Sequence, residues 1–344
     1  MTTHVDESRA QVLEEAVEAA SRPDLPEEKL RAFVQRYFRH VADEDLEERD
    51  PVDIAGCCLS HWQLAKHRAD GTANVRVYTP TVDEHGWSTG HTVVEIVTDD
   101  MPFLVDSVTM ELARHGVGVH VVVHPIVRVR RDGDGNLLGL AADGEQGENV
   151  VVESFVHVEV DRETSPHILA SIRTDLTRVL DDVRAATGDW LNMLAKLRHV
   201  VDDLDSTPPP LPAGDVAEGR ALLEWMGDQH FTFLGYREYE LTRVGDDDVL
   251  RAVPGTALGL LRNAPGGTSL SFADLPPEIR AHARDRELLV LTKTNRRSTV
   301  HRPTYLDYVG VRRFDAPGVV VGEHRFLGLF TSTAYNVSPI EVPI

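Results

Sequence analysis

The first half of the chain switches repeatedly between helical and strand spacing of its apolar positions. After Pro26, apolar side chains recur every three or four residues, and this spacing predicts an amphipathic helix. The residues are Leu30, Phe33, Val34, Tyr37, Phe38 and Val41. A second helix is expected after Pro51, because proline suits a first helical turn and apolar positions at helical spacing follow it. Runs rich in β-branched residues at 74–80 and 91–98 then predict two strands.

The stretch TDDMPFLVDSVTMELARHGVGVHVVVHP, at 98–125, predicts the end of a strand, a tight turn, a helix and a new strand. The helix is expected over 103–115, where apolar residues form one stripe, and the strand over 117–130. A further strand is predicted at 153–160 and a long helix at about 165–204. The resulting β-α-β-β-α order is that of a ferredoxin-like sandwich, so we expect an α+β fold.

A proline-rich stretch, STPPPLPAGD at 206–215, separates the two halves of the chain. Its prolines favour a stiff and extended spacer. Beyond it the pattern predicts a β-rich module, with strand-like runs at 230–241, 287–293, 298–314 and 318–335. The predicted organisation is an N-terminal helical segment (1–70), a ferredoxin-like domain (71–205), a linker (206–214) and an incomplete β-rich module (215–344).

Composition narrows the range of partners and compartments. The formal net charge is −21 and the pI is about 5.1, so nucleic acid and anionic membrane surfaces are poor partners. The adjacent Cys57 and Cys58 give no disulfide framework and suit a reducing compartment. The polar start of the chain, and the lack of an apolar run near the ~18 residues of a spanning helix, predict a cytoplasmic protein.

Two aspartates and a proline precede the helix predicted at 103–115. Asp99 and Asp100 can cap that helix, because a carboxylate accepts the free N–H groups of a first turn. Pro102 is tolerated at the same place. The alternative is that these N–H groups capture the carboxylate of a ligand. Capping is the simpler interpretation.

Three histidines, His115, His120 and His124, suggest a metal site by their closeness in sequence. Four strand residues separate His120 from His124, which is about 13 Å at ~3.3 Å per residue, so these two cannot share one ion. His115 with His120 remains a candidate pair, and a metal hydrolase using it is one alternative function. The sequence contains no dinucleotide fingerprint, HExxH or GxSxG pattern. We therefore predict no metal, bound cofactor or catalytic residue in this chain.

Long stretches of the sequence resemble the N-terminal region of the large bacterial NAD-specific glutamate dehydrogenases. They are GTANVRVYTPTVDEHGW (71–87), HTVVEIVTDDMPFLVDSV (91–108), HFTFLGYREYEL (230–241), STVHRPTYLDYVGVRRF (298–314) and RFLGLFTSTAYN (325–336). The likeness is collinear and runs over nearly the whole chain. It implies ACT-type modules of ferredoxin-like fold. It also implies a cytoplasmic homotetramer that oxidises L-glutamate to 2-oxoglutarate and ammonia, with the NAD and catalytic domains beyond Ile344.

The resemblance gives this chain a regulatory and assembly role, and a stand-alone amino-acid-sensing module is the alternative. ACT modules that bind amino acids typically carry an Asp-x-Pro-Gly-Leu-like turn, and here Phe103 replaces its glycine. A bulky side chain at this position should hinder the approach of a ligand to the backbone. The residues implied in effector binding or in an interface are Asp99, Asp100, Met101, Pro102, Phe103, Leu104, Gly116 and Gly118.

The second face of the predicted sheet suggests self-association. A ferredoxin-like sheet carries helices on one face only. His120, Phe155, His157 and Glu159 are expected on the other face, where a mixture of this kind resembles an interface more than a solvated surface. We therefore expect a homo-oligomer that forms through the ACT-like module.

Overall fold

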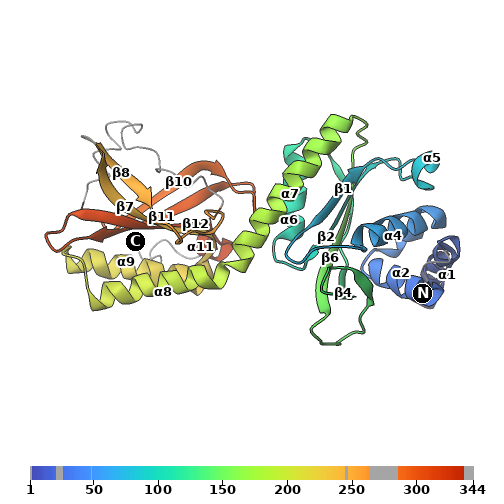
Figure 1. Ribbon diagram of the computed structural model, residues 1–344, viewed down its shortest axis with the longest axis horizontal. Coiled ribbons are helices and arrows are strands. Elements are labelled where there is room, and N and C mark those ends of the chain that lie inside the picture. Colours follow the sequence, from blue (N-terminus) through green and yellow to red (C-terminus); the bar gives the residue numbers. More distant parts are fainter. Residues whose placement is uncertain (1, 21–25, 48, 245–246, 263–285, 337–344) are drawn as a thin grey trace. The chain divides into compact units, whose positions relative to one another are not determined.

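The structure is a computed structural model that describes residues 2–20, 26–47, 49–244, 247–262 and 286–336. The chain divides into two compact units, Met1–Asp181 and Asp182–Ile344 (Figure 1). Each unit contains one six-stranded antiparallel sheet with helices packed on it. The predicted α+β class is therefore confirmed.

The first sheet centres on its longest strand, β6. Its strands are β1 (Asn74–Tyr78), β2 (Thr92–Asp99), β3 (Val119–Val123), β4 (Ile126–Arg131), β5 (Leu137–Leu140) and β6 (Val150–Val160). β2 pairs along one side of β6, while β3 and β4 share the other side. The prediction of one continuous strand over 117–130 is wrong, because Pro125 has no N–H and interrupts the ladder between β3 and β4.

Helices cover both faces of this sheet (Figure 1). On one face lie α6 (Leu104–Arg114) and α7 (Pro166–Gly188). On the other face lie α1 (Thr2–Ala19), α2 (Glu27–Tyr37) and α4 (Pro51–Ala65). Two short helices, α3 (Asp43–Glu47) and α5 (Val82–His85), lie in the connections. Neighbouring residues of β2 serve the two layers in turn, because strand side chains alternate between faces. Val94 and Ile96 pack with α6 and α7, whereas Val93 and Val97 pack with the N-terminal helices.

The expectation of an uncovered second sheet face is wrong. Phe155 is fully buried, and its ring centroid lies 5.6 Å from that of Phe33 on α2. His157 and Glu159 are also buried beneath the N-terminal helices. These helices occupy the surface from which self-association was expected, because their apolar stripes need the same cover. Of the residues assigned to that surface, His120 remains partly exposed.

The long helix expected at about 165–204 is divided into α7 and α8 (Trp190–Ser206). Asp189 lies between them, buried, and its carboxylate accepts the backbone N–H of Gly259 at 2.8 Å. α8 packs on the second sheet through Met193, Leu197 and Val200. The boundary between the two units lies between Asp181 and Asp182, within α7. The proline-rich stretch, predicted to separate the domains, instead joins α8 to the next helix of the second unit.

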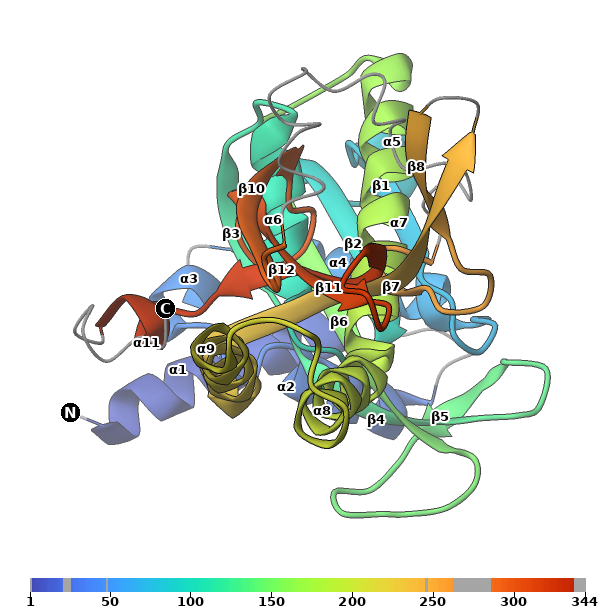
Figure 2. The ribbon, with the colours of Figure 1, turned by 90° about the vertical axis from the view of Figure 1, so that its left-hand side faces the viewer.

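The second sheet has the order β10-β11-β12-β7-β8, and β9 also pairs with β7. Its strands are β7 (Phe231–Val244), β8 (Asp247–Ala252), β9 (Leu258–Gly259), β10 (Leu289–Arg297), β11 (Tyr305–Phe314) and β12 (Val320–Phe330). α8 and α9 (Ala213–Trp225) run side by side on one face (Figure 2). They bury an aromatic group made of Phe231, Phe233, Tyr236 and Phe326. The π-turn η1 (Met226–His230) leads into β7, and α11 (Ser332–Asn336) follows β12.

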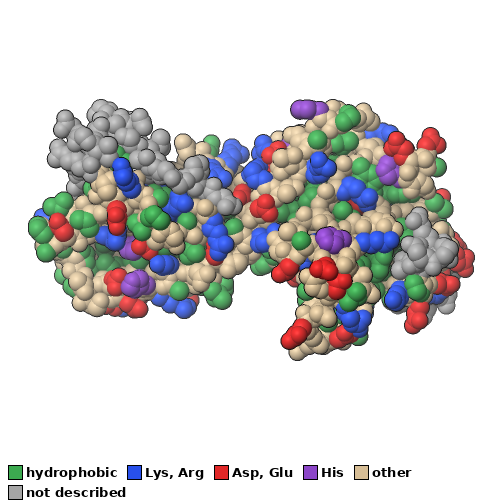
Figure 3. All heavy atoms as spheres, viewed as in Figure 1, with side chains coloured by type: hydrophobic (Ala, Val, Ile, Leu, Met, Phe, Trp, Pro, Cys, Tyr) green, Lys and Arg blue, Asp and Glu red, His purple; other side chains and the backbone are tan. Residues whose placement is uncertain are grey.

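The surface carries charges of both signs. Acidic and basic side chains are interspersed on the face drawn in Figure 3, so the acidic excess is not gathered in one block there. Within the described ranges, none of the helices combines the length and the apolar character needed to cross a membrane.

Candidate functional site

The turn before α6 holds the residues predicted to bind an effector. Asp99 accepts a hydrogen bond from the buried Arg68 at 2.8 Å. Asp100 Oδ1 accepts the hydroxyl proton of Ser154, on β6, at 2.8 Å. The N-cap of α6 is Phe103, which makes no side-chain cap. Both aspartates therefore tie the turn to neighbouring parts of the first unit. Met101 packs on the α6 side of the core, and Pro102 is exposed.

A buried ion network supports the base of this turn. Arg68 Nε donates to Glu153 Oε1 at 2.7 Å, and Arg131 meets the same carboxylate with two bonds of 2.6 and 2.8 Å. Glu153 is fully buried and both arginines are nearly so. Together with Asp99 the network has two positive and two negative groups, and pairing of this kind makes the burial of charge tolerable. The end of β2 is thereby held in place.

Phe103 keeps the backbone of the glycine that it replaces. Its φ of 68° and ψ of 6° lie in the left-handed region, where glycine is favoured and bulky residues are rare. Gly116 has a φ of +75° just after α6, as a helix C-terminus commonly requires. Gly118 donates its N–H to Asp161 at 2.7 Å, and an added Cβ would lie 2.9 Å from that carboxylate. The turn thus has the expected backbone shape but carries an aromatic side chain.

The histidines considered for a metal hydrolase lie in separate clusters. His115 Nε2 lies 3.0 Å from an oxygen of Asp175. His120 Nε2 lies 2.8 Å from Asp161, and its ring stacks on that of His91 with centroids 4.4 Å apart. The structure therefore gives no support to a metal held jointly by His115 and His120.

Sequence spacing did not reveal a polar cluster buried between α4 and the sheet. His61, Glu95 and His157 are fully buried and place possible ligand atoms within 4.8 Å of one another. Both ring nitrogens of His61 are already engaged, by the Tyr37 hydroxyl at 2.8 Å and the Ile96 carbonyl at 3.0 Å. Burial lowers the pKa of His61 to about 4, so the ring is neutral near pH 7. These contacts favour a hydrogen-bonded core over a metal centre.

Glu159 is the charged end of this cluster. It lies 2.8 Å from Arg49, 3.1 Å from His91 and 3.2 Å from His157. Burial opposes its ionisation, but hydrogen bonds and charge from His157 and Arg49 outweigh burial and lower the pKa of Glu159 to about 2. Burial also acts against protonation of His157, yet Cys57 and Glu159 raise the pKa of that histidine. The pair is therefore held in its charged form.

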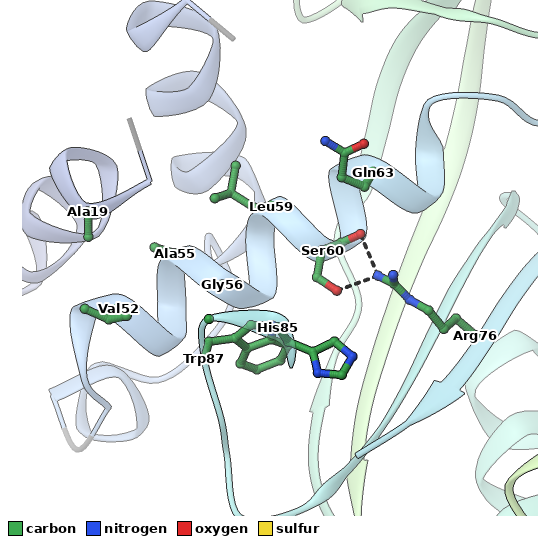
Figure 4. Close-up of a pocket in the computed structure, with 11 residues that line it drawn as sticks. Ala19, Val52, Ala55, Gly56, Leu59, Ser60, Gln63, Arg76, His85 and Trp87 are labelled. Atoms are coloured by element: carbon green, nitrogen blue, oxygen red, sulfur yellow. Dashed lines mark hydrogen bonds between the residues drawn. The ribbon is translucent and has the colours of Figure 1, made fainter. Parts of the chain in front are cut away.

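A cavity of about 260 Å³ opens beside α4 (Figure 4). Trp87 forms an apolar wall against Gly56, where an added Cβ would lie 2.2 Å from the tryptophan Cγ. Arg76 reaches the cavity from β1 and is anchored by the Ser60 carbonyl at 2.7 Å and by Glu95 at 2.9 Å. We call this space the α4 cavity; it is lined by Ala19, Val52, Ala55, Gly56, Leu59, Ser60, Gln63, Arg76, His85, Gly86 and Trp87.

A second cavity, of about 220 Å³, lies where the C-terminal end of α2 meets the start of β4. We call it the α2–β4 cavity; it is lined by Arg36, Arg39, His40, His124, Pro125, Ile126, Arg128, Asp143 and Val152. Neither of the two cavities is lined by a residue of the turn Asp99–Leu104. The turn that resembles the amino-acid-binding turn of ACT modules therefore lies outside both cavities.

Comparison with known proteins identifies what this chain is similar to. Residues 33–176 match the family described as "Glutamate dehydrogenase, ACT1 domain". The resemblance to the glutamate dehydrogenases is confirmed. The chain is 37% identical over 311 residues to an NAD-specific glutamate dehydrogenase of Pseudomonas aeruginosa. The aligned residues make up 90% of this chain and 19% of that protein. A relative of the same name from Halomonas elongata is 37% identical over 314 residues, 91% of this chain and 20% of the relative.

A more distant relative extends the match across almost the whole chain. The NAD-specific glutamate dehydrogenase of Mycobacterium tuberculosis is 26% identical over 349 residues, which covers 98% of this chain and 20% of the relative. The chain thus spans about a fifth of the length of the curated relatives it matches. The ACT1 region begins in α2 and ends in α7, so it contains the turn and most of the residues that line the two cavities.

Proposed function

We propose that this chain is a regulatory and assembly region of an NAD-dependent glutamate dehydrogenase, which oxidises L-glutamate to 2-oxoglutarate and ammonia. The observation that carries the proposal is the collinear match of about nine tenths of the chain to relatives that bear this name. The ACT1 match supports a regulatory module in place of a catalytic one.

The chain alone does not oxidise glutamate under this proposal. The buried networks around Glu153 and His61 consist of ion pairs and hydrogen bonds within the fold. NAD and the catalytic groups belong to other parts of the dehydrogenase. Purified chain with glutamate and NAD should therefore give no NADH absorbance above a mock purification, and turnover above that background would overturn this part of the proposal.

Assembly of a cytoplasmic homo-oligomer, a tetramer by resemblance, is the second half of the proposed role. Because helices cover both faces of the first sheet, we place the contact at strand edges. β10 lies at one end of the order of the second sheet, and Leu291 on it is 38% exposed. An edge strand offers backbone N–H and C=O groups to a second copy.

Deletion in a full-length relative tests both roles together. The segment that aligns with this chain would be removed from the Pseudomonas aeruginosa enzyme, and NADH formation and molar mass by light scattering would be measured. We expect glutamate turnover to remain, with a smaller assembly or an altered response to amino acids. Loss of all turnover in a folded enzyme with an unchanged number of subunits would contradict the proposal, because it would place the segment in the catalytic machinery.

A further inference from the structure

The α2–β4 cavity gathers positive charge in a chain that is strongly acidic. Its lining includes Arg36, Arg39 and Arg128 but a single acid, Asp143, whereas the whole chain has a formal charge of −21. With its histidines counted as neutral, the lining carries three positive charges and one negative charge, a surplus of two. A concave surface lined by one sign of charge concentrates ions of the opposite sign.

The single acid does not neutralise these arginines. Asp143 Oδ1 lies 3.5 Å from Arg36 and its Oδ2 lies 3.8 Å from Arg39, and the aspartate side chain is 75% exposed. Strong guanidinium–carboxylate bonds are about 2.7–2.9 Å long, and exposed pairs at greater distance contribute little. Arg36 is instead held in place through Nη1, which donates to the carbonyl of Ala141 at 2.9 Å. Among the described residues, the one polar contact of the other amino group, Nη2, is Asp143 at 3.5 Å.

Arg128 is the arginine with most to gain from a ligand. It lies on β4 directly opposite Val152 of β6, and both residues line the cavity. Its side chain is half-buried, and in the described parts of the chain this side chain makes neither a hydrogen bond nor an ion pair. The guanidinium is therefore available to a ligand, and a bound oxyanion would form charge-assisted hydrogen bonds with it.

The remaining walls set the size of the ligand and connect it to the rest of the unit. Pro125, Ile126 and Val152 provide apolar surface, and a volume of about 220 Å³, below the roughly 300–1,000 Å³ of most ligand pockets, limits the ligand to a few heavy atoms. His124 Nε2 lies 2.9 Å from Ser154 Oγ, and that hydroxyl donates to Asp100. His124 must therefore donate through Nε2, which places this cavity two hydrogen bonds from the turn before α6.

We propose that the α2–β4 cavity binds a small dianion whose carboxylate or phosphoryl oxygens accept hydrogen bonds from Arg36, Arg39 and Arg128. The planar fork of arginine matches either oxyanion with two parallel bonds. Two negative charges on the ligand balance the surplus of two on the lining. Binding of this kind belongs to the chain itself, so it stands or falls independently of the proposed dehydrogenase role.

Isothermal titration calorimetry on the full chain tests the proposal with two probes, succinate and inorganic phosphate, each at matched ionic strength against sodium chloride. We expect one or both to bind with one-to-one stoichiometry, and the tighter of the two identifies the source as carboxylate or phosphoryl. Arg128→Gln should weaken binding at least tenfold. Arg173→Gln, the same change on the exposed side of α7, serves as the matched control and should leave the affinity unchanged.

A gain of affinity provides the second criterion. Asp143→Asn removes the one opposing carboxylate from an exposed position, so it should leave the fold intact and tighten binding at least threefold. No heat above the chloride control with either probe would overturn the proposal. So would equal losses in Arg128→Gln and Arg173→Gln, because that result would show general attraction to basic side chains and not this cavity.

Discussion

Phe103 offers a sharp test of the turn that links β2 to α6. A non-glycine residue in the left-handed region costs about 1–2 kcal/mol relative to a relaxed backbone. Glycine removes that strain, but its greater conformational freedom in the unfolded chain lowers the stability of the folded state by about 0.4–1 kcal/mol. Phe103→Ala and Phe103→Gly lose the same half-buried ring, roughly 2 kcal/mol if half of the usual cost of a core phenylalanine applies. At the observed φ of 68°, the glycine variant should therefore be more stable than the alanine variant by about 0.5–1 kcal/mol.

Urea denaturation of the two variants beside the parent chain measures this difference directly. The expected order of stability is parent, then Phe103→Gly, then Phe103→Ala. The same pair of changes at Ile168, a partly exposed residue of α7, should show the reverse order, because glycine in a helix is about 1 kcal/mol less stable than alanine. An alanine variant as stable as the glycine variant at Phe103 would refute the left-handed backbone there.

Three further predictions concern the packing and charge of the first unit. Gly56→Ala should lower the free energy of unfolding by about 1–3 kcal/mol, because the added methyl group overpacks against Trp87. Gly214→Ala is the control: no atom lies within 4 Å of the added Cβ, so it should be neutral or stabilising. Thermal denaturation of both variants measures the difference. Arg68→Met should cost about 1.5–3 kcal/mol in chemical denaturation, because the buried Glu153 loses one of its two arginine partners and Asp99 loses its hydrogen bond from Arg68, and a loss under 1 kcal/mol would contradict that role. Because the pKa of Glu159 falls from its usual 4.5 to about 2, its contribution of about 3 kcal/mol should be present above pH 4.5 and lost as the pH falls toward 2. Glu159→Gln should flatten that part of the stability profile, and an unchanged slope would show that other carboxylates control it.

The sequence was sufficient for the elements whose pattern is local. The helical stripe at 103–115 and the strand at 153–160 lie where α6 and β6 are found, because a single period of apolar residues extends along each. The long helix at about 165–204 shows the limit of that signal. Its apolar period runs across Asp189, and the division into α7 and α8 depends on a contact with Gly259 that no local pattern contains.

The cover of the first sheet could not be predicted for a related reason. A mixture such as Phe155, His157 and Glu159 on one strand face is compatible with an interface, a solvated surface or a buried polar core. The structure gives the third outcome because α4 supplies Cys57 as a polar partner of His157 and packs the His61 ring against Phe155, and Arg49 pairs with the Glu159 carboxylate. Burial of these groups depends on partners far away in the sequence: Cys57 and His157 are 100 residues apart.

The same reasoning explains why the α2–β4 cavity has no signature in the sequence. Arg36 and Arg39 fall between the apolar positions of the amphipathic helix predicted after Pro26, where solvated arginines need no explanation. Their meaning changes once Arg36 is bonded to Ala141, 105 residues further along, and Arg128 lies in the same wall without a partner among the described residues. The turn Asp99–Leu104, by contrast, is visible in the sequence because its resemblance is local. Asp100 connects the two through Ser154 and His124, so the site that sequence suggested and the cavity that only the fold reveals belong to one hydrogen-bonded structure.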